Sequence, residues 1–316
     1  MTHTPFGPGK EFDSIRTMLD VWGPVAHGIG DDAAILTVPP GQQLIVSTDA
    51  SVEDVHFRHA WMSPENIGER AATAALSDLA AMGARADSVL VSIIAPASWR
   101  EYLPTFAAGV KHSVQAAGAR IVGGNIALGR EVSCTFTVIG YTDTPVKRSG
   151  AAAGDLLFVT GTLGGPGTAL LALERGQTPP VWALDRFLHP VARLDAGLWL
   201  ARNSAQAMID ISDGLAADAR HLATAGGLVA ELWPESVPRF EGVSATDALA
   251  SGEEYELLVA LPEHMAAEVA RTFHETFRLP LTQVGILRSS TTPEGDRPNS
   301  ASRVELPGGH DHFSSR

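Results

Sequence analysis

The chain has 316 residues, of which 45% are hydrophobic and 19% charged, so a disordered chain is excluded and about two domains are expected. Subtracting 36 acidic from 23 basic residues leaves a formal net charge of −13. That balance argues against a nucleic-acid binder, which needs a basic face, and against docking on an anionic membrane.

Cysteine content and the chain start indicate the compartment. Cys134 is the only cysteine, which excludes an intrachain disulfide or a Cys-based zinc site and fits a reducing cytoplasm. The first residues lack the basic and apolar regions of a secretory signal. The uncharged run Leu156–Leu173 contains four glycines and Pro166, which predicts a strand, a loop and a helix rather than a membrane span. We therefore expect a cytoplasmic protein.

Strand and helix patterns alternate along the chain, which predicts an α/β (α+β) fold. Ser63 and Pro64 have the residue types that open a helix, and Gly83 and Gly118 the type that ends one. The first half is expected to contain a helix over Glu11–Trp22, strands over Ala33–Val38 and Gln43–Thr48, a helix over Pro64–Met82, a strand over Ser88–Ala95, a helix over Ser98–Ala117, and strands over Ala119–Val122 and Val132–Tyr141.

A composition change at Thr144–Gly154, rich in Gly and Ala, predicts a boundary between an N-terminal domain (residues 1–146) and a C-terminal domain (residues 147–316). The polar segment Ser289–Ser302 is expected to be a surface loop. Between them we expect strands over Asp155–Thr160, Ala207–Ile211, Tyr255–Leu261 and Thr282–Leu287, and helices over Thr168–Arg175, Leu215–Ala225 and Glu263–Phe277.

Common nucleotide-binding signatures do not fit this chain. It has no Gly-x-x-x-x-Gly-Lys-Ser/Thr loop and no protein-kinase motifs. Gly28–Ala33 matches Gly-x-Gly-x-x-Ala, but it precedes a predicted strand, and its two aspartates would repel a pyrophosphate. The dinucleotide interpretation is therefore rejected.

Acidic residues at strand ends and loop starts carry the strongest chemical signal. Carboxylates in apolar surroundings are costly to leave unpaired, and Arg and Lys are scarce near these in sequence. Mg²⁺ binds carboxylate oxygens together with water and phosphate, so it would be a suitable partner. The set comprises Asp31 and Asp32 in GIGDDAA, Asp49 in LIVSTD, Asp78 in ALSDLAAMGA, and Asp210 and Asp213 in MIDISDGL.

Structural alternatives exist for most of this set. Asp213 taken alone is better explained as a helix cap, and Asp49 equally well as a turn residue. Asp78 falls inside a predicted helix, where it has no capping function. Two glycine stretches, Gly123–Asn125 and Gly161–Gly165, are each expected to follow a strand, and each fits phosphate binding and a tight turn equally well.

Taken together and in order, the motifs GIGDDAAI, STDASVEDVHF, ALSDLAAMGA, GGN, RSGAAAGD, VTGTLGG, IDISDGLAAD and SGEEYEL resemble those of the thiamine-monophosphate kinase family. This family belongs to the superfamily of aminoimidazole ribonucleotide synthetase. The resemblance implies a two-domain synthetase-like fold, with an N-terminal ATP- and Mg-binding domain that forms a barrel across a homodimer, and a C-terminal α/β domain. It also implies ATP as co-substrate, thiamine phosphate as acceptor and several Mg²⁺ ions.

The resemblance also implies roles for individual residues, and none is a catalytic group separate from the ligands. The implied substrate contacts are His56, Glu253 and His310, and the implied ATP contacts are Gly124, Asn125, Arg148 and Ser212. The implied magnesium ligands are Asp32, Ser47, Thr48, Asp49, Asp78, Asn125, Asp210 and Asp213.

Three positions depart from the family pattern. Asn125 stands where many members have Asp, so one metal site loses a negative charge. Ala107 replaces a tyrosine near the nucleotide, and His310 replaces an aromatic residue, often Trp, that packs on the substrate. Two alternatives therefore stay open: another ATP-using superfamily member, such as a purine-pathway synthetase, or a non-catalytic nucleotide-binding dimer.

Overall fold

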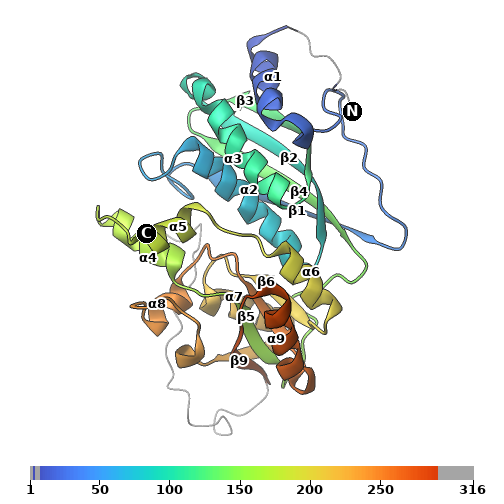
Figure 1. Ribbon diagram of the computed structural model, residues 1–316, viewed down its shortest axis with the longest axis vertical. Coiled ribbons are helices and arrows are strands. Elements are labelled where there is room, and N and C mark those ends of the chain that lie inside the picture. The colour runs from blue at the N-terminus through green and yellow to red at the C-terminus, as the bar shows by residue number, and fades with distance from the viewer. Residues whose placement is uncertain (1–2, 4–7, 291–316) are drawn as a thin grey trace. The chain divides into compact units, whose positions relative to one another are not determined.

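The computed structural model describes residue 3 and residues 8–290, so His310 and most of the expected surface loop Ser289–Ser302 lie outside the described residues (Figure 1). The chain divides into two compact units. One comprises Met1–Leu79 and Ala84–Asp143, and the other comprises Ala80–Gly83 and Thr144–Arg316. Each unit has its own sheet.

A mixed four-stranded sheet with the order β1-β4-β2-β3 forms the first unit, counted over the described residues. β4 pairs antiparallel with β1 and β2, and β2 pairs parallel with β3. Figure 1 shows α2 and α3 running along this sheet. The elements are α1 (Lys10–Trp22), η1 (Gly23–Val25), β1 (Gln43–Val52), α2 (Pro64–Ala81), β2 (Arg85–Ala95), η2 (Ala97–Tyr102), α3 (Leu103–Ala116), β3 (Arg120–Leu128) and β4 (Ser133–Thr142).

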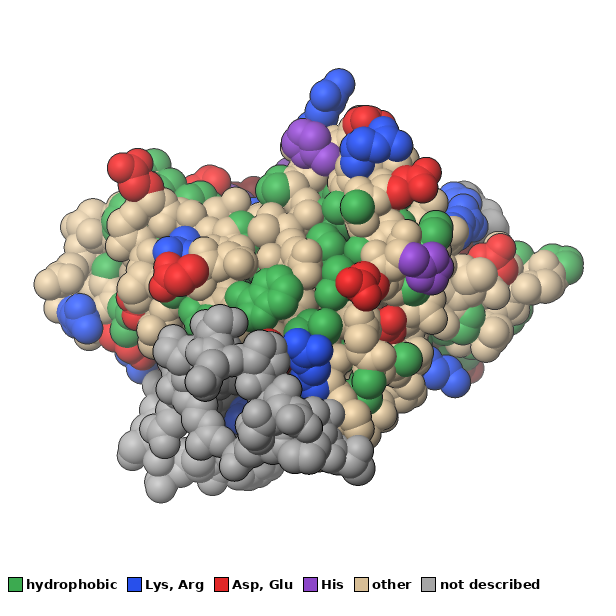
Figure 2. Space-filling view, turned by 90° about the horizontal axis from the view of Figure 1, so that it is seen from below, with side chains coloured by type: hydrophobic (Ala, Val, Ile, Leu, Met, Phe, Trp, Pro, Cys, Tyr) green, Lys and Arg blue, Asp and Glu red, His purple; other side chains and the backbone are tan. Residues whose placement is uncertain are grey.

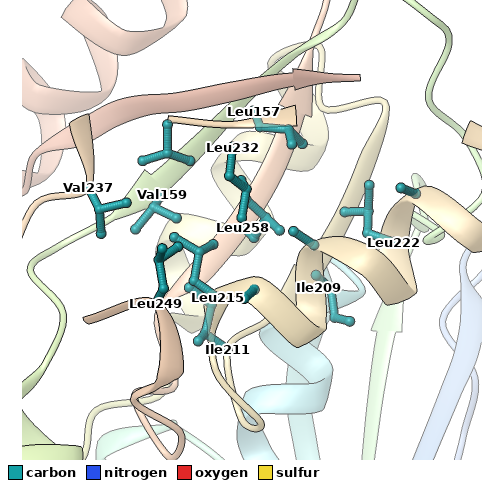
Figure 3. Packing of buried hydrophobic residues seen from close by; sticks show 14 of the residues in the cluster. Leu157, Val159, Ile209, Ile211, Leu215, Leu222, Leu232, Val237, Leu249 and Leu258 are labelled. Carbon is teal, nitrogen blue, oxygen red and sulfur yellow. The ribbon is translucent and has the colours of Figure 1, made fainter. Parts of the chain in front are cut away.

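An antiparallel five-stranded sheet, order β6-β8-β5-β9-β7, forms the described part of the second unit. In Figure 3, Leu215 and Leu222 of α7 lie in one cluster with Ile209, Leu157 and Leu258 of the sheet, all of them buried. The elements are β5 (Leu156–Thr160), α4 (Gly165–Glu174), α5 (Val181–Leu188), α6 (Leu194–Arg202), β6 (Ala207–Asp210), α7 (Leu215–Ala225), β7 (Leu228–Leu232), η3 (Pro234–Ser236), α8 (Ala245–Ala250), β8 (Leu257–Leu261), α9 (Glu263–Phe277) and β9 (Leu281–Ser289).

Several sequence predictions about local structure were wrong. Ala33–Val38 is not a strand: within the described chain it has no strand neighbour to bond with, and Ile35 is 97% exposed. Asp49 does not end its strand, because β1 continues to Val52. Gly123–Asn125 does not follow a strand but lies inside β3. The helix expected over Ser98–Ala117 is a 3₁₀ turn followed by α3, with Pro104 in the first turn of α3.

The face of the molecule drawn in Figure 2 carries mixed charge. In the view of Figure 2, Asp and Glu side chains are interspersed with Lys and Arg rather than gathered in a patch of one sign. Among the helices of the described residues, none combines the length and the apolar character that crossing a membrane requires.

Candidate functional site

An acidic group lies on β1 and α2 in the first unit. Ser47 and Asp49 are two residues apart on β1, so their side chains share one face of the strand. The Ser47 hydroxyl donates a 2.5 Å hydrogen bond to Oδ2 of Asp78, in the last turns of α2. The structure therefore brings together two of the predicted metal ligands, the Ser47 hydroxyl and the Asp78 carboxylate, and places Asp49 on the same strand face as Ser47.

Thr48 does not share this face of β1, and Asp32 lies in a separate segment of the chain. The Thr48 side chain lies on the opposite face of β1, where its hydroxyl is 3.2 Å from the hydroxyl of Thr137 on β4. Asp32 is exposed and lies in the irregular segment between η1 and β1. If Thr48 binds a metal ion on the face of Ser47, its backbone rather than its side chain would make the contact.

Gly124 and Asn125 lie side by side on β3, an edge strand of the sheet. A Cβ atom at Gly124 would be only 1.9 Å from the carbonyl oxygen of Val91 on β2. The close approach of the two strands therefore requires a glycine here whatever the ligand. Asn125 is exposed, so its amide side chain is available to a ligand.

His56 follows β1 in a turn whose hydrogen bonds orient the imidazole. The backbone N–H of Val52 donates to Nδ1 of His56 (3.1 Å), and the backbone N–H of His56 donates to the Val52 carbonyl (2.9 Å). Because Nδ1 accepts this hydrogen bond, a neutral His56 carries its proton on Nε2. In this tautomer Nε2–H is a hydrogen-bond donor, the type of group that can donate to a phosphate oxygen or a heterocycle nitrogen.

In the second unit, the DISDG motif forms the turn from β6 into α7. Ile209 and Ile211 are buried in the hydrophobic cluster of Figure 3 and fix both sides of Asp210, which is 5% exposed. Ser212 is exposed and Asp213 is half-buried. The apolar residues of the turn therefore anchor it, while its polar residues remain reachable by a ligand.

Asp218, the last residue of the motif IDISDGLAAD, supports the DISDG turn and was not among the site residues predicted from the sequence. Its Oδ2 accepts hydrogen bonds from the backbone N–H groups of Ser212 and Asp213, both at 3.1 Å. Burial, followed by the charges of Asp213 and Asp210, raises the pKa of Asp218 to about 7. The spacing Asp213 to Asp218 was the available signal, since it places the carboxylate one helical turn into α7, beneath the DISDG turn.

Glu253 is joined to the DISDG turn by backbone hydrogen bonds. Its N–H donates to the Ser212 carbonyl (2.7 Å), and the N–H of Tyr255 donates to the Ile211 carbonyl (2.9 Å). Glu253 and Tyr255 have φ angles of 57° and 53°, in the left-handed region that costs a non-glycine residue roughly 1–2 kcal/mol. Such strain is typical of functional segments held in place by their surroundings. The predicted ATP contact and the predicted substrate contact thus share one hydrogen-bonded pair of segments.

The glycine stretch Gly161–Gly165 binds the protein's own carboxylate. The N–H of Gly164 donates to Oε1 of Glu254 (2.6 Å), and this oxygen also accepts from the Ser251 hydroxyl (2.5 Å). The Ser251 hydroxyl in turn accepts from the N–H of Gly167 in α4 (3.0 Å). Of the two interpretations left open for this stretch, the tight turn has the structural support, because Glu254 occupies the amide that a phosphate would use.

Glu254 gives a pH-dependent prediction for stability. Burial raises its pKa to about 7 from the ordinary 4.5, against opposing hydrogen bonds from Ser251 and Gly164. The folded chain therefore holds this proton more tightly than the unfolded chain, and the free energy of unfolding falls as pH rises from about 4.5 to about 7. Because Glu254→Gln cannot titrate, its stability relative to the parent should rise across this window by on the order of 1–3 kcal/mol. Urea denaturation of both proteins at pH 5 and pH 8 tests this, and an unchanged difference between them would contradict it.

Arg148 lies in the segment after β4, where it is exposed and outside any helix or strand. Its guanidinium has the donors for bidentate binding of a phosphate. The structure therefore leaves Arg148 accessible to a ligand.

A divalent cation needs several oxygen donors close together. Among the described residues, no three His, Cys, Asp or Glu side chains are grouped closely enough to hold an ion by themselves. The available donors are carboxylate, hydroxyl and amide oxygens, and Asp210 and Asp213 both act on the pKa of Asp218 through their negative charge. Mg²⁺ is usually bound by one or two protein carboxylates, and water and phosphate oxygens complete its coordination. The residues therefore fit Mg²⁺ bound together with a phosphate ligand.

Two family models match this chain. The model "AIR synthase related protein, N-terminal domain" matches residues 30–142, and the model "AIR synthase related protein, C-terminal domain" matches residues 152–292. Together they account for most of the sequence and for both units.

Curated relatives and solved structures are similar to this chain over most of its length. Thiamine-monophosphate kinase of Haemophilus influenzae is 29% identical, with 96% of this chain and 98% of the relative covered. The enzyme of the same name from Salmonella typhimurium is 33% identical, covering 80% and 81%. A solved structure described as AaThiL complexed with AMPPCP and TMP is 31% identical, with 96% of both chains covered and a TM-score of 0.73.

Proposed function

We infer that this chain, which belongs to the thiamine-monophosphate kinase family, transfers the terminal phosphoryl group of ATP to thiamine phosphate and forms ADP and thiamine diphosphate. One observation carries this inference: the match to AaThiL, solved with AMPPCP and TMP, extends over 96% of both chains. AMPPCP stands in for ATP, with a carbon in place of the oxygen bridging the β- and γ-phosphorus atoms.

The chemistry needs positioning and charge compensation rather than a general base. The acceptor is a phosphate monoester whose second pKa is about 6, so it is largely deprotonated at neutral pH. The obstacle is repulsion between two anionic phosphates, and Arg148 would offset part of it by binding one of them. Because the acceptor needs no general base, we propose direct in-line transfer between the two phosphates, without a phosphoenzyme.

Magnesium ions are part of the proposal. Bound Mg²⁺ would neutralise phosphate charge during transfer. The residues proposed to hold it are Asp32, Ser47, Thr48 (through its backbone), Asp49, Asp78, Asn125, Asp210 and Asp213. Asn125 supplies a neutral oxygen, so we expect a weaker site there than an aspartate would give.

The remaining proposals concern the substrate contacts, the two domains and the compartment. We propose ATP contacts at Gly124, Asn125, Arg148 and Ser212, and thiamine phosphate contacts at His56, Glu253 and His310. Residues 1–146 would form the ATP- and Mg-binding domain and residues 147–316 the C-terminal domain. The proposed compartment is the cytoplasm, the source of the ATP that the reaction consumes.

An acceptor panel tests the inference. Purified protein with ATP and Mg²⁺ is offered thiamine phosphate, unphosphorylated thiamine or no acceptor, and ADP is followed by chromatography. ADP formation that depends on thiamine phosphate supports the kinase assignment. ADP formation that ignores the acceptor, or ATP binding without any ADP, would favour another superfamily activity or a nucleotide-binding protein.

A homodimer is proposed on the exposed edge of the first sheet. β1 is an edge strand of ten residues, and its even-numbered side chains Leu44, Val46, Thr48 and Ala50 are exposed. A long apolar edge strand invites pairing with another chain. Ile35 and Val38, in the segment before β1, add further exposed apolar surface. A second copy of this chain packed on β1 would bury both the edge strand and this apolar surface.

The double substitution Leu44→Asp, Val46→Asp should therefore convert a dimer to a monomer. Two buried carboxylates at an apolar interface are costly and repel their symmetry mates. Analytical ultracentrifugation should give about twice the chain mass of 33.3 kDa for the parent and 33.3 kDa for the variant. A substitution at exposed Leu171 on α4, Leu171→Asp, is the matched control and should leave the mass unchanged. A monomeric parent would contradict the proposal.

A further inference from the structure

We propose that a cavity at the N-terminal end of α2 binds a 4-aminopyrimidine ring, the flat heterocycle that adenine and thiamine have in common. The cavity has a volume of about 640 Å³ and is lined by residues 59–64, Trp99 and Tyr102, all in the first unit. Its volume lies within the range of small-molecule sites. The choice of this ring rests on the proposed function, because both proposed substrates carry it.

The cavity is distinct from the Ser47–Asp78 pair. Ser63 lies directly before α2, and Asp78 follows it by 15 residues along the same helix. At a rise of 1.5 Å per residue, the two positions are about 22 Å apart. None of the described residues proposed above for metal, ATP or thiamine phosphate binding lines the cavity. A ligand here would therefore contact side chains to which no role has yet been given.

Aromatic rings form the walls of the cavity. The ring centroid of Trp99 lies 6.0 Å from that of His59 and 6.3 Å from that of Tyr102. Trp61 belongs to the same lining, and the guanidinium of Arg58 covers one face of its ring at 4.4 Å. Tyr102 is 44% exposed, so its ring is accessible from solvent. Side chains of this kind stack on flat heterocycles with little dependence on their sequence of atoms, as they do on nucleobases.

The polar character of the lining favours an uncharged ligand. The described residues that line the cavity include no Asp, Glu, Lys or Arg. The Ser63 hydroxyl donates to Oδ1 of Asn66 (2.7 Å) and accepts from the backbone N–H of Asn66 (3.2 Å), so helix capping already uses it. A phosphate or an ammonium group would find no charged partner in this lining. A 4-aminopyrimidine ring is neutral at pH 7 and does not need one.

Trp99 supplies the polar group that selects a heterocycle over a hydrocarbon ring. The residue is 5% exposed, and its buried Nε1–H has no hydrogen-bond partner among the residues that the structure describes. An indole N–H is a donor only, and a buried one usually has a partner. A ring nitrogen of an aminopyrimidine accepts a hydrogen bond in the plane of the ring. We therefore assign Trp99 as the donor to the bound ring.

NMR of the ¹⁵N-labelled indole groups tests the assignment in the full chain. The chain has six tryptophans, and the Trp99 peak is the one missing from Trp99→Phe. Thiamine or adenosine, both without phosphate, is added in EDTA and should move the Trp99 peak. The peak of Trp182, which is stacked on Phe240 in the second unit, should stay in place. Benzyl alcohol, a flat ring without a ring nitrogen, should bind at least about 5-fold more weakly.

Calorimetric titration of two aromatic deletions gives a second measurement. Tyr102→Ala removes a half-exposed wall of the cavity and should weaken binding of the same probes at least about 5-fold. Trp182→Ala removes an aromatic ring from the second unit and is the matched control, so it should leave the affinity unchanged. If Trp99→Phe fails to fold, these two variants decide.

Each outcome has one interpretation. Binding of thiamine alone assigns the cavity to thiamine compounds, binding of adenosine alone assigns it to adenine nucleotides, and binding of both assigns it to the shared ring. A Trp99 peak that neither probe moves, or an affinity that Tyr102→Ala leaves unchanged, would overturn the proposal. Because binding is measured without turnover, this result is separate from that of the acceptor panel, which tests the proposed function.

Discussion

Asp78→Asn should lower kcat at least about 100-fold, the scale on which removal of a single preorganised charge-stabilising group acts. Asp78 lies in α2 with its Oδ2 bound to the Ser47 hydroxyl, and Asn keeps the shape and an oxygen acceptor while removing the negative charge. Without metal the variant should be about as stable as the parent, because loss of one carboxylate relieves repulsion with its acidic neighbours. Initial rates across a Mg²⁺ titration, with thermal melts in EDTA, measure both.

Ser47→Ala is the control for the Asp78 prediction. It removes the hydrogen-bond donor to Asp78 and one neutral proposed ligand but keeps the carboxylate charge, so its loss of rate should be smaller than that of Asp78→Asn. A rate equal to that of the parent for Asp78→Asn at limiting Mg²⁺ would remove Asp78 from the metal site.

Asp218→Ala has the second large expected effect, on both activity and stability. It deprives the Ser212 and Asp213 N–H groups of their shared acceptor, which should cost about 2–3 kcal/mol of unfolding free energy. The DISDG turn would also lose its anchor, and a displacement near 1 Å can cost about 100-fold in rate. We expect KM for ATP to rise as well, because Ser212 is the proposed nucleotide contact.

Asp218→Asn separates the hydrogen bonds from the charge. Asn still offers an oxygen to both N–H groups, so it should restore most of the stability lost in Asp218→Ala. Urea denaturation of the two variants and the parent gives the comparison. Equal destabilisation by Asn and Ala would mean that the carboxylate charge, and not its acceptor geometry, holds the turn.

Sequence patterns predicted much of the fold because most elements bury an apolar face. The helices α7 and α9 begin and end where their patterns predicted, and β5 and β9 differ by only a few residues. The strand predicted over Ala33–Val38 is absent because a strand needs a neighbouring strand to bond with. The sequence cannot show that the described chain provides none there. The short elements α5, α6, β7 and α8 were missed because their patterns are too brief to separate from loops.

The site was predictable residue by residue but not as a set of contacts. Asp78 was singled out because an aspartate inside a helix has no cap to form, and the structure places it on Ser47. Asp218 was not singled out because a buried carboxylate in a helix pattern looks like an ordinary polar position. Only its contacts with two backbone N–H groups reveal what it holds.

The central claim is direct transfer from ATP to thiamine phosphate, and a rapid-quench experiment with [γ-³²P]ATP tests it most directly. The protein is mixed with labelled ATP, Mg²⁺ and thiamine phosphate, and label is followed in thiamine diphosphate and on the protein. The account predicts one labelled thiamine diphosphate per ADP, no label on the protein at any time, and no product in EDTA. ADP without labelled thiamine diphosphate, or a protein-bound label that decays into product, would contradict it.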